Sequence, residues 1–317
     1  MPDLKATREG FGKGLLELGR KNPDVVVVDA DLGDSTKAEM FGKEFPERYF
    51  TMGIAEQSMV GTAAGLSVCG KTAFCSTFAT FSERAYEFFR NIVARNNLNV
   101  KLVASHSGLA TGEDGKSAQA IEDIAAYRAL PNVIVLQPAD FVEAEKMVHA
   151  LAEHKGAAYM RVHRTAVPVI HNENYDFKIG KGEILKEGKD AVIFASGTMV
   201  NESLKAYDLL KSDGIGASIV NISTIKPLDK ELIINLAKKT DCVVTAEDHS
   251  IIGGLGGAIS ELLSENYPVF VTRIGVNDTF GESGKPSELY EKYGLSAKHI
   301  AIRVKEALKK KSEVIRH

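Results

Sequence analysis

Short runs of apolar residues alternate with segments of helical period along almost the whole chain. The run Val25–Asp29 (V-V-V-V-D) is typical of a parallel strand that is covered on both faces. Further runs predict strands at Val100–Ala104, Val133–Leu136, Ala158–Val162, Ala191–Ala195, Ala217–Asn221, Cys242–Ala246 and Val269–Ile274. The segments between them predict helices at Ala6–Gly19, Glu83–Asn96, Phe141–Glu153, Asn201–Ser212, Lys230–Lys238 and Gly257–Asn266. This alternation predicts an α/β protein built on mainly parallel, twisted sheets with helices on both faces.

The alternation is interrupted between Thr165 and Gly188, where proline, glycine and polar residues show no helical period. We interpret this segment as a connector, or as a connector with an edge hairpin. The chain is therefore expected to have a first domain over residues 1–170, a linker over 171–188 and a second domain over 189–317. At 317 residues it is long enough for two domains that each bury a core.

Composition narrows the class of protein. Hydrophobic residues make up 44% and charged residues 26%, as in globular proteins. The formal net charge of −3 argues against broad binding to nucleic acid. Three cysteines without C-x-x-C spacing favour a reducing, cytoplasmic location. The longest uncharged stretch is shorter than the ~20 residues of a membrane helix, and the charged N-terminus has no signal-peptide pattern, so no membrane association is expected.

Chemistry is expected where the carboxyl ends of parallel strands meet, because loops and helix N-termini converge there. In the first domain the segments at these ends are Asp31–Thr36, Ser76–Arg84, Ser105–Gln119 and Arg161–Thr165. A further candidate is Glu56, in the motif M-G-I-A-E-Q, because apolar residues flank it. A buried carboxyl would stay protonated and be able to share its proton. The alternative is a first-turn glutamate that interacts favourably with the helix dipole.

Two other segments combine aromatic or polar residues with glycine. Phe78 and Phe81 are three residues apart, which places them on one face of a turn; the alternative is ordinary core packing. His106 lies in a long glycine-rich loop directly after a strand. It is suited to shuttle a proton or to donate to a developing oxyanion, and the alternative is a structural histidine.

Scattered arginines and one serine are weaker candidates. Arginine is suited to bidentate recognition of phosphate, although isolated arginines are usually surface residues. The group consists of Arg8, Ser35, Arg161 and Arg164. The glycine-rich run Ile252–Ala258 departs from the dinucleotide-binding pattern, and the histidines show no metal-ligand spacing, so no metal site is predicted in this chain.

These segments, in this order, resemble the transketolase family of thiamine-diphosphate enzymes. The most specific motifs are C-S-T-F-A-T-F, S-H-S-G-L-A-T-G-E-D-G-K-S and S-G-K-P-S-E-L, while G-I-A-E-Q is shared more widely. The resemblance covers the pyrimidine-binding and C-terminal domains of the family. The G-D-G motif of the diphosphate-binding domain is absent. The resemblance therefore implies the C-terminal subunit of a split transketolase, with the N-terminal subunit as a separate chain.

The resemblance also implies which residues bind thiamine diphosphate. Glu56 matches the glutamate that contacts the pyrimidine ring nitrogen and so helps to remove the thiazolium proton. Ile54 matches the apolar prop that bends the cofactor, and Phe78 and Phe81 match the aromatic pair of its pocket. Asp31 lies in the cofactor-adjacent loop. The implied Mg²⁺ or Ca²⁺ is expected to be held mainly by the partner chain.

For the substrate, the resemblance assigns a second catalytic residue and a binding group. His106 matches the histidine near the reacting hydroxyls, and Asp114 the acid that binds a donor hydroxyl. Arg8, Ser35 and Arg164 match the groups that hold the sugar phosphate, which makes them one predicted anion-binding clamp.

The loop departs from the family at one position. Bacterial and fungal members have a histidine, and animal-type members a glutamine, where this chain has Ala118. Either the adjacent Gln119 takes over substrate binding and proton transfer after a small shift of the loop, or a water molecule or a partner residue does.

The implied activity is transfer of a two-carbon ketol unit from a ketose phosphate to an aldose phosphate, as in the pentose phosphate pathway. The expected assembly is a heterotetramer of two copies of this chain and two N-terminal subunits. One alternative is the β subunit of a 2-oxo acid dehydrogenase, which has the same layout but does not need the phosphate clamp. A 1-deoxy-D-xylulose-5-phosphate synthase, normally one long chain, is disfavoured by length. A non-catalytic scaffold is favoured only by Ala118.

Overall fold

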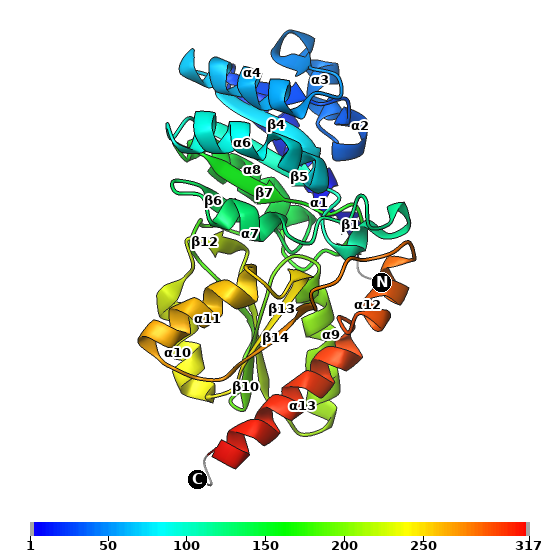
Figure 1. Cartoon of the computed structure of the whole chain (residues 1–317), viewed down its shortest axis with the longest axis vertical. Helices are drawn as coiled ribbons and strands as arrows, with labels where there is room; N and C mark the ends of the chain where they lie inside the picture. Colours follow the sequence, from blue (N-terminus) through cyan, green and yellow to red (C-terminus); the bar gives the residue numbers. More distant parts are fainter. Residues whose placement is uncertain (1–2, 315–317) are drawn as a thin grey trace.

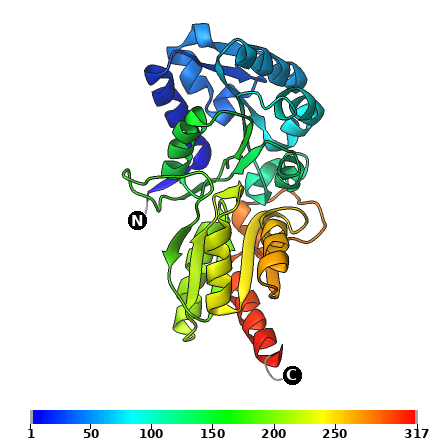
Figure 2. The ribbon, with the colours of Figure 1, turned by 90° about the vertical axis from the view of Figure 1, so that its left-hand side faces the viewer.

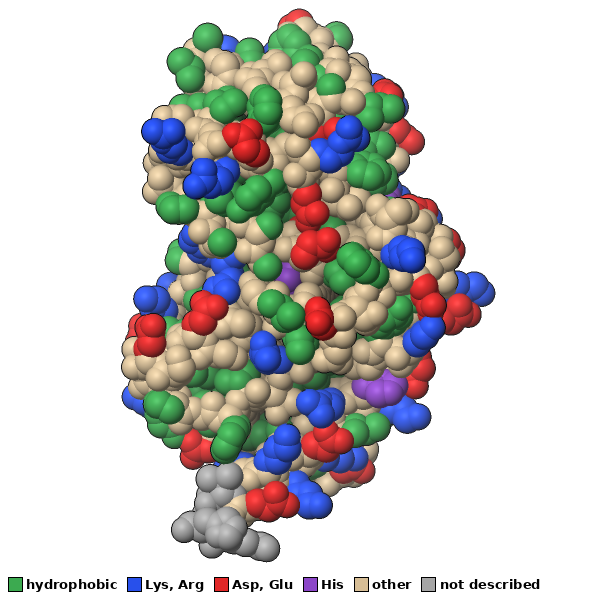
Figure 3. All heavy atoms as spheres, in the orientation of Figure 1, with side chains coloured by type: hydrophobic (Ala, Val, Ile, Leu, Met, Phe, Trp, Pro, Cys, Tyr) green, Lys and Arg blue, Asp and Glu red, His purple; other side chains and the backbone are tan. Residues whose placement is uncertain are grey.

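Two twisted sheets, one in each of two lobes, form the framework of the protein. The structure is a computed structural model that describes residues 3–314, and it shows the lobes stacked end to end (Figures 1 and 2). Lysine, arginine and acidic side chains are interspersed over the face seen in Figure 3, without a broad field of one sign. This distribution agrees with the near-neutral charge of the sequence.

The first sheet has seven strands in the order β12-β6-β7-β5-β4-β2-β3. All neighbours are parallel except β12, which is antiparallel to β6. The strands are β2 (Val25–Asp29), β3 (Tyr49–Thr51), β4 (Thr72–Phe78), β5 (Val100–Ser105), β6 (Ile134–Leu136), β7 (Ala158–Arg161) and β12 (Thr224–Lys226). Since β12 lies far along the chain, the second half contributes a strand to the first sheet.

The second sheet has five strands in the order β14-β13-β10-β11-β9, and only the edge strand β9 is antiparallel to its neighbour. The strands are β9 (Glu183–Lys186), β10 (Ala191–Ala195), β11 (Ala217–Asn221), β13 (Val243–Ser250) and β14 (Val271–Val276). A separate antiparallel pair joins β1 (Leu4–Ala6) to β8 (Ala166–Pro168). The predicted class, α/β with mainly parallel sheets in two domains, is confirmed.

Helices cover both faces of each sheet. In the first half they are α1 (Thr7–Lys21), α2 (Gly33–Thr36), α3 (Glu39–Glu44), α4 (Glu56–Val68), α5 (Ala79–Ser82), α6 (Tyr86–Phe88), α7 (Asp123–Arg128) and α8 (Phe141–Glu153). Short 3₁₀ segments lie at Pro46–Arg48, Glu83–Ala85 and Leu109–Asp114, and the last is kinked at Gly112. In the second half they are α9 (Met199–Ser212), α10 (Lys230–Thr240), α11 (Leu255–Asn266), α12 (Pro286–Lys292) and α13 (Ala297–Val314).

The strand β2 shows how the sequence pattern produces these layers. Its side chains alternate between the two faces of the sheet. Val25 and Val27 join the apolar core that contains α1 and α8, whereas Val26 and Val28 join the core on the face of α4. All four valines are buried, which is why the strand is a continuous apolar run and not an alternating one.

The helix predicted over Glu83–Asn96 is helical over Glu83–Ala94, but it is not a regular α-helix. The segment consists of a 3₁₀ turn, the short α6 and a π-helical stretch, Phe89–Ala94. Tyr86 and Phe89 both pack edge-on against the buried Tyr127, and this tertiary packing accompanies the departure from regular α-helical geometry.

The central strand β4 was not predicted as a strand. Its sequence, T-A-F-C-S-T-F, has small and hydroxyl residues in place of a β-branched run, and its burial between β2 and β5 is a tertiary effect. The predicted linker is also not wholly irregular. Glu183–Lys186 pairs with β11 as an edge strand, and no hairpin forms. The domain boundaries at 170 and 189 stay a prediction.

Candidate functional site

Four loops leave the same edge of the first sheet. The strands β7, β5, β4 and β2 are parallel neighbours, so their carboxyl ends lie side by side. The segments that the sequence indicated, Asp31–Thr36, Ser76–Arg84, Ser105–Gln119 and Arg161–Thr165, span or follow these strand ends. The edge therefore collects polar residues from distant parts of the chain, as expected of a ligand site in a parallel sheet.

Glu56 has an unusual environment at this edge. It is the first residue of α4, and its side chain is only 2% exposed. Its Oε2 atom is buried without a hydrogen-bond partner, and the nearest cation, Nε of the exposed Arg84, is 3.6 Å away. Buried carboxylate oxygens are normally hydrogen-bonded, so this atom is placed to receive a donor that the chain itself does not supply. Glu56 is thus both a first-turn residue and a buried one.

Three rings form a stack beside the loops after β4 and β5. Phe78 and Phe81 are stacked with ring centroids 5.4 Å apart and an interplanar angle of 13°. Phe78 also stacks on His106, with centroids 3.7 Å apart. No third ring fits between two rings at these separations, so a flat ligand would lie against an outer face or an edge of the stack. Ile54, with 74% of its surface exposed, is a free apolar side chain that precedes α4.

His106 is held in a strained and buried position. Its backbone φ of 57° is in the left-handed region, which non-glycine residues rarely adopt. Its Nδ1 atom lies 3.0 Å from the hydroxyl of Ser105. Burial and the positive charges of Arg8 and Arg164 lower the pKa of His106 to about 3. The imidazole is therefore neutral at physiological pH and able to exchange hydrogen bonds without carrying charge.

Four of the predicted substrate residues form two adjacent pairs. Nη1 of Arg8 donates to the backbone carbonyl of Ser35 at 2.8 Å, and Nη1 of Arg164 contacts Oδ1 of Asp114 at 2.9 Å. Burial, together with the nearby charge of Arg164, lowers the pKa of Arg8, and its Nε is buried without a partner. Two guanidinium groups held close together repel each other, and an anion bound between them would relieve that repulsion.

The remaining candidates lie in other settings. Arg161 is fully buried and paired with Asp123 at 2.8 Å, so it is a structural residue. Asp31 is exposed, with a φ of 62°, after β2. Gln119 is buried, and its Nε2 donates to the carbonyls of Gly112 (3.1 Å) and Glu282 (2.9 Å).

Sequence reasoning missed two contributions to the site. Arg84 is the cation beside Glu56, but nothing in its local sequence marks it. Asp248 of the second domain contacts the loop that carries His106. The polar run Glu247–His249 at the end of a predicted strand was the signal that could have found it, because buried charged residues at such a position need partners.

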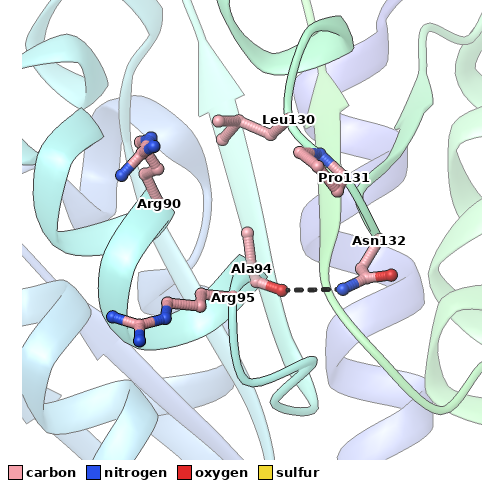
Figure 4. A pocket seen from close by; sticks show the side chains of 6 residues that line it. All are labelled: Arg90, Ala94, Arg95, Leu130, Pro131 and Asn132. Atoms are coloured by element: carbon pink, nitrogen blue, oxygen red, sulfur yellow. Dashed lines mark hydrogen bonds between the residues drawn. The ribbon is translucent and has the colours of Figure 1, made fainter.

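A separate hollow of about 240 Å³ lies away from this edge (Figure 4). It is lined by Arg90, Ala94, Arg95, Leu130, Pro131 and Asn132. Asn132 donates to the carbonyl of Ala94 at 3.2 Å across it. These residues precede β5 and β6, so the hollow is on the amino-end side of the sheet and apart from the candidate site.

Two kinds of feature are absent from residues 3–314, a metal-binding cluster and a membrane-spanning helix. No group of three or more histidine, cysteine or acidic side chains is arranged to hold a metal ion. No helix in this described part of the chain has the length and apolar character needed to cross a membrane.

Fold and site together define a two-domain α/β protein with a polar, ring-lined edge on its first sheet. Comparison with known families specifies the class. The sequence model of the transketolase pyrimidine binding domain matches residues 4–169, and that of the transketolase C-terminal domain matches residues 180–300.

Individual relatives agree with the domain matches. The chain is 50% identical to a putative transketolase C-terminal section of Methanocaldococcus jannaschii, over 96% of this chain and 97% of that one. A solved structure described as a split gene transketolase, inactive beta4 tetramer, shares 50% identity with a TM-score of 0.90, covering 96% of this chain and 98% of that one. Human transketolase is 37% identical over 97% of this chain, which spans 50% of the human protein.

The chain therefore belongs to the transketolase family, and it corresponds to the C-terminal section of a split-gene transketolase. The family places it among the transferases.

Proposed function

We propose that this chain supplies the pyrimidine-binding half of the active site of a two-subunit transketolase. The assembly transfers a two-carbon ketol unit from a ketose phosphate to an aldose phosphate. The observation that carries the proposal is the buried Glu56 carboxyl, whose Oε2 has no partner within the chain.

The residues at this edge fit thiamine diphosphate. When bound, that cofactor supplies a carbon nucleophile that accepts the ketol unit. Glu56 would hold or share a proton with a ring nitrogen at its free Oε2. The stack of Phe78 and Phe81 offers an aromatic surface, and the exposed Ile54 an apolar one, to a cofactor ring. As the family resemblance implies, we assign the Mg²⁺ or Ca²⁺ and the diphosphate to the partner subunit.

The second part of the site suits a phosphorylated sugar. Arg8 and Arg164 are close enough for their charges to interact, and a phosphate between them would offset that repulsion. The neutral His106 and the carboxylate of Asp114 are hydrogen-bonding groups for sugar hydroxyls. In this proposal Ser35 helps to bind the phosphate, Asp31 stays near the cofactor, and Gln119 takes the place of the family's histidine or glutamine.

The partner is a separate N-terminal subunit. This chain spans about half of the length of relatives such as human transketolase, which supports the proposal that another polypeptide supplies the other half of the site. We propose that two copies of this chain and two N-terminal subunits form the active assembly. The similar structure described as an inactive tetramer of β chains is in keeping with a chain that associates with itself and needs a partner for activity.

The test is to mix this chain with the N-terminal subunit and to assay ketol transfer between xylulose phosphate and ribose phosphate. We expect turnover by the mixture, almost none by this chain alone, and none with pyruvate. Glu56→Gln should lower kcat of the mixture by about 10²–10⁴-fold, the range for losing a proton-transfer group. Glu143→Gln is a matched control, because Glu143 is also a buried first-turn glutamate but lies on α8. Normal turnover by the Glu56→Gln assembly, or turnover only with pyruvate, would refute the proposal.

A further inference from the structure

Asp248 of the second domain binds the backbone of a loop that belongs to the first domain. It lies in β13 and is completely buried. The N–H groups of Leu109 and Ala110 donate to its Oδ1 and Oδ2 at 2.8 and 2.9 Å. The hydroxyl of Tyr290 donates to Oδ2 at 2.9 Å. Since charge-assisted hydrogen bonds are the strong ones, this carboxylate is an anchor for the loop.

The anchored loop is the one that carries the proposed sugar-binding groups. His106 lies three residues before Leu109, and Asp114 ends the helical turn Leu109–Asp114. Gly108, with a φ of 70°, lets the backbone of the loop lie close to Asp248, because a Cβ atom at this position would be only 2.4 Å from Cγ of Asp248. Leu109 and Ala110 are themselves buried in the apolar core of the second domain.

The far end of the loop contacts the second domain as well. Nε2 of Gln119 joins the carbonyl of Gly112 in the loop to that of Glu282. A Cβ atom at Gly115 would lie 2.5 Å from Oγ of Ser283, so the backbone of the loop packs directly against the side chain of Ser283 there. The loop is thus held at both ends by segments of the second domain.

We propose that Asp248 is a positioning residue of the substrate site. By fixing the N–H groups of Leu109 and Ala110 it sets the backbone between His106 and Asp114, and so the spacing of the two groups that receive the sugar. Asp248 does not touch the sugar. This inference rests on the proposed function, and it gives the second domain, which sequence reasoning left without a role in the site, a part in substrate binding.

Hydrogen exchange in the full assembly tests the anchor itself. Asp248→Asn replaces one acceptor oxygen by a donor, so one of the two loop N–H groups loses its partner. Exchange at Leu109 or at Ala110, whichever loses its acceptor, should become at least about tenfold faster. The matched control is Glu247→Gln, because Glu247 is equally buried and accepts the N–H groups of Leu255 and Gly256, which are outside the loop. The control should speed exchange only at its own two partners. Unchanged exchange at Leu109 and Ala110 in the Asp248→Asn assembly would overturn the inference.

Steady-state kinetics of the same variants test the consequence of the anchor for sugar binding. Asp248→Asn should raise KM for the ketose phosphate about tenfold and leave the affinity for thiamine diphosphate unchanged, because Glu56 and the ring stack belong to other segments. Glu247→Gln should change neither value. If Asp248→Asn does not fold, Tyr290→Phe, which removes a single hydrogen bond to the carboxylate, should show the same pattern to a smaller extent. An unchanged KM, or a parallel loss of cofactor affinity, contradicts the inference. A wild-type assembly without sugar-phosphate turnover would instead refute the proposed function, and the exchange result would still decide whether Asp248 holds the loop.

Discussion

The carboxyl edges of the two sheets use buried carboxyl groups in opposite ways. At the first edge, Glu56 has an oxygen without a partner, and Arg8 has a buried Nε in the same condition. At the second edge, both oxygens of Glu247 and of Asp248 accept hydrogen bonds from the chain. A satisfied carboxylate holds the fold together, whereas an unsatisfied one costs stability unless a ligand completes it. The difference supports the proposal that ligands bind at the first edge and that the second edge holds the fold.

Among the substitutions that test this comparison through substrate affinity or stability, the largest effect is expected from removing a cation at the first edge. Arg164→Ala should raise KM for phosphorylated sugars about 10–100-fold, since a hydrogen bond to a charged group contributes roughly 1.5–3 kcal/mol. The thermal stability of the chain should hardly change, because the Arg164–Asp114 pair is more than one-third exposed. Steady-state kinetics with a ketose phosphate and with its unphosphorylated counterpart would measure the effect.

The control for that substitution is Arg20→Ala. Arg20 is an exposed arginine whose ion pair with Glu44 lies outside the four loops of the first edge, and its loss should leave KM unchanged. Equal changes in KM for the phosphorylated and unphosphorylated sugars would show that Arg164 does not bind the phosphate. That result would contradict the proposal that the first edge is the ligand-binding one.

A smaller effect, on the pH dependence of stability, is expected at the predicted linker, where the buried His171 lies between two acidic side chains. His171 lies 3.1 Å from Oδ1 of Asp140 and 2.8 Å from Oε2 of Glu183. Burial by itself lowers the pKa of His171, but Asp140, Glu183 and Glu143 outweigh it and raise the pKa to about 10. Because the folded-state pKa is raised, the stabilisation is complete below the unfolded value of about 6.5 and is lost as pH rises towards 10.

His171→Gln should therefore lower the free energy of unfolding at pH 7 and remove a decline of up to about 1.4 kcal/mol per pH unit between pH 7 and 9. Denaturant unfolding at several pH values measures this. His299→Gln is the control, because His299 is partly exposed and lies 3.7 Å from Glu291. An identical pH slope in the wild type and the His171 variant would show that this histidine carries no linked charge.

Sequence patterns were most successful where local and tertiary requirements coincide. β2 has the predicted bounds, Val25–Asp29, and so does α8, which Asp140 caps by accepting from the N–H of Glu143. The same patterns did not predict the strand β4 or the π-helical geometry of Phe89–Ala94. In both places the segment packs against distant parts of the chain.

In the candidate site, too, sequence patterns alone predicted less than tertiary contacts decide. Glu56, the phenylalanine pair and the arginines were selected by family resemblance, and spacing alone left each with a structural alternative. Asp248 was missed because its partner Leu109 is 139 residues away in the chain. No local pattern indicates which loop a buried carboxylate in another domain will hold.

The central claim is that the free oxygen of Glu56 belongs to a cofactor site completed by a second polypeptide. Calorimetric titration of thiamine diphosphate with Mg²⁺ into this chain, into the N-terminal subunit and into their mixture tests it most directly. We expect saturable binding with the highest affinity in the mixture and almost none to this chain alone. Binding by this chain alone as tight as by the mixture, or no binding by the mixture, would contradict the account.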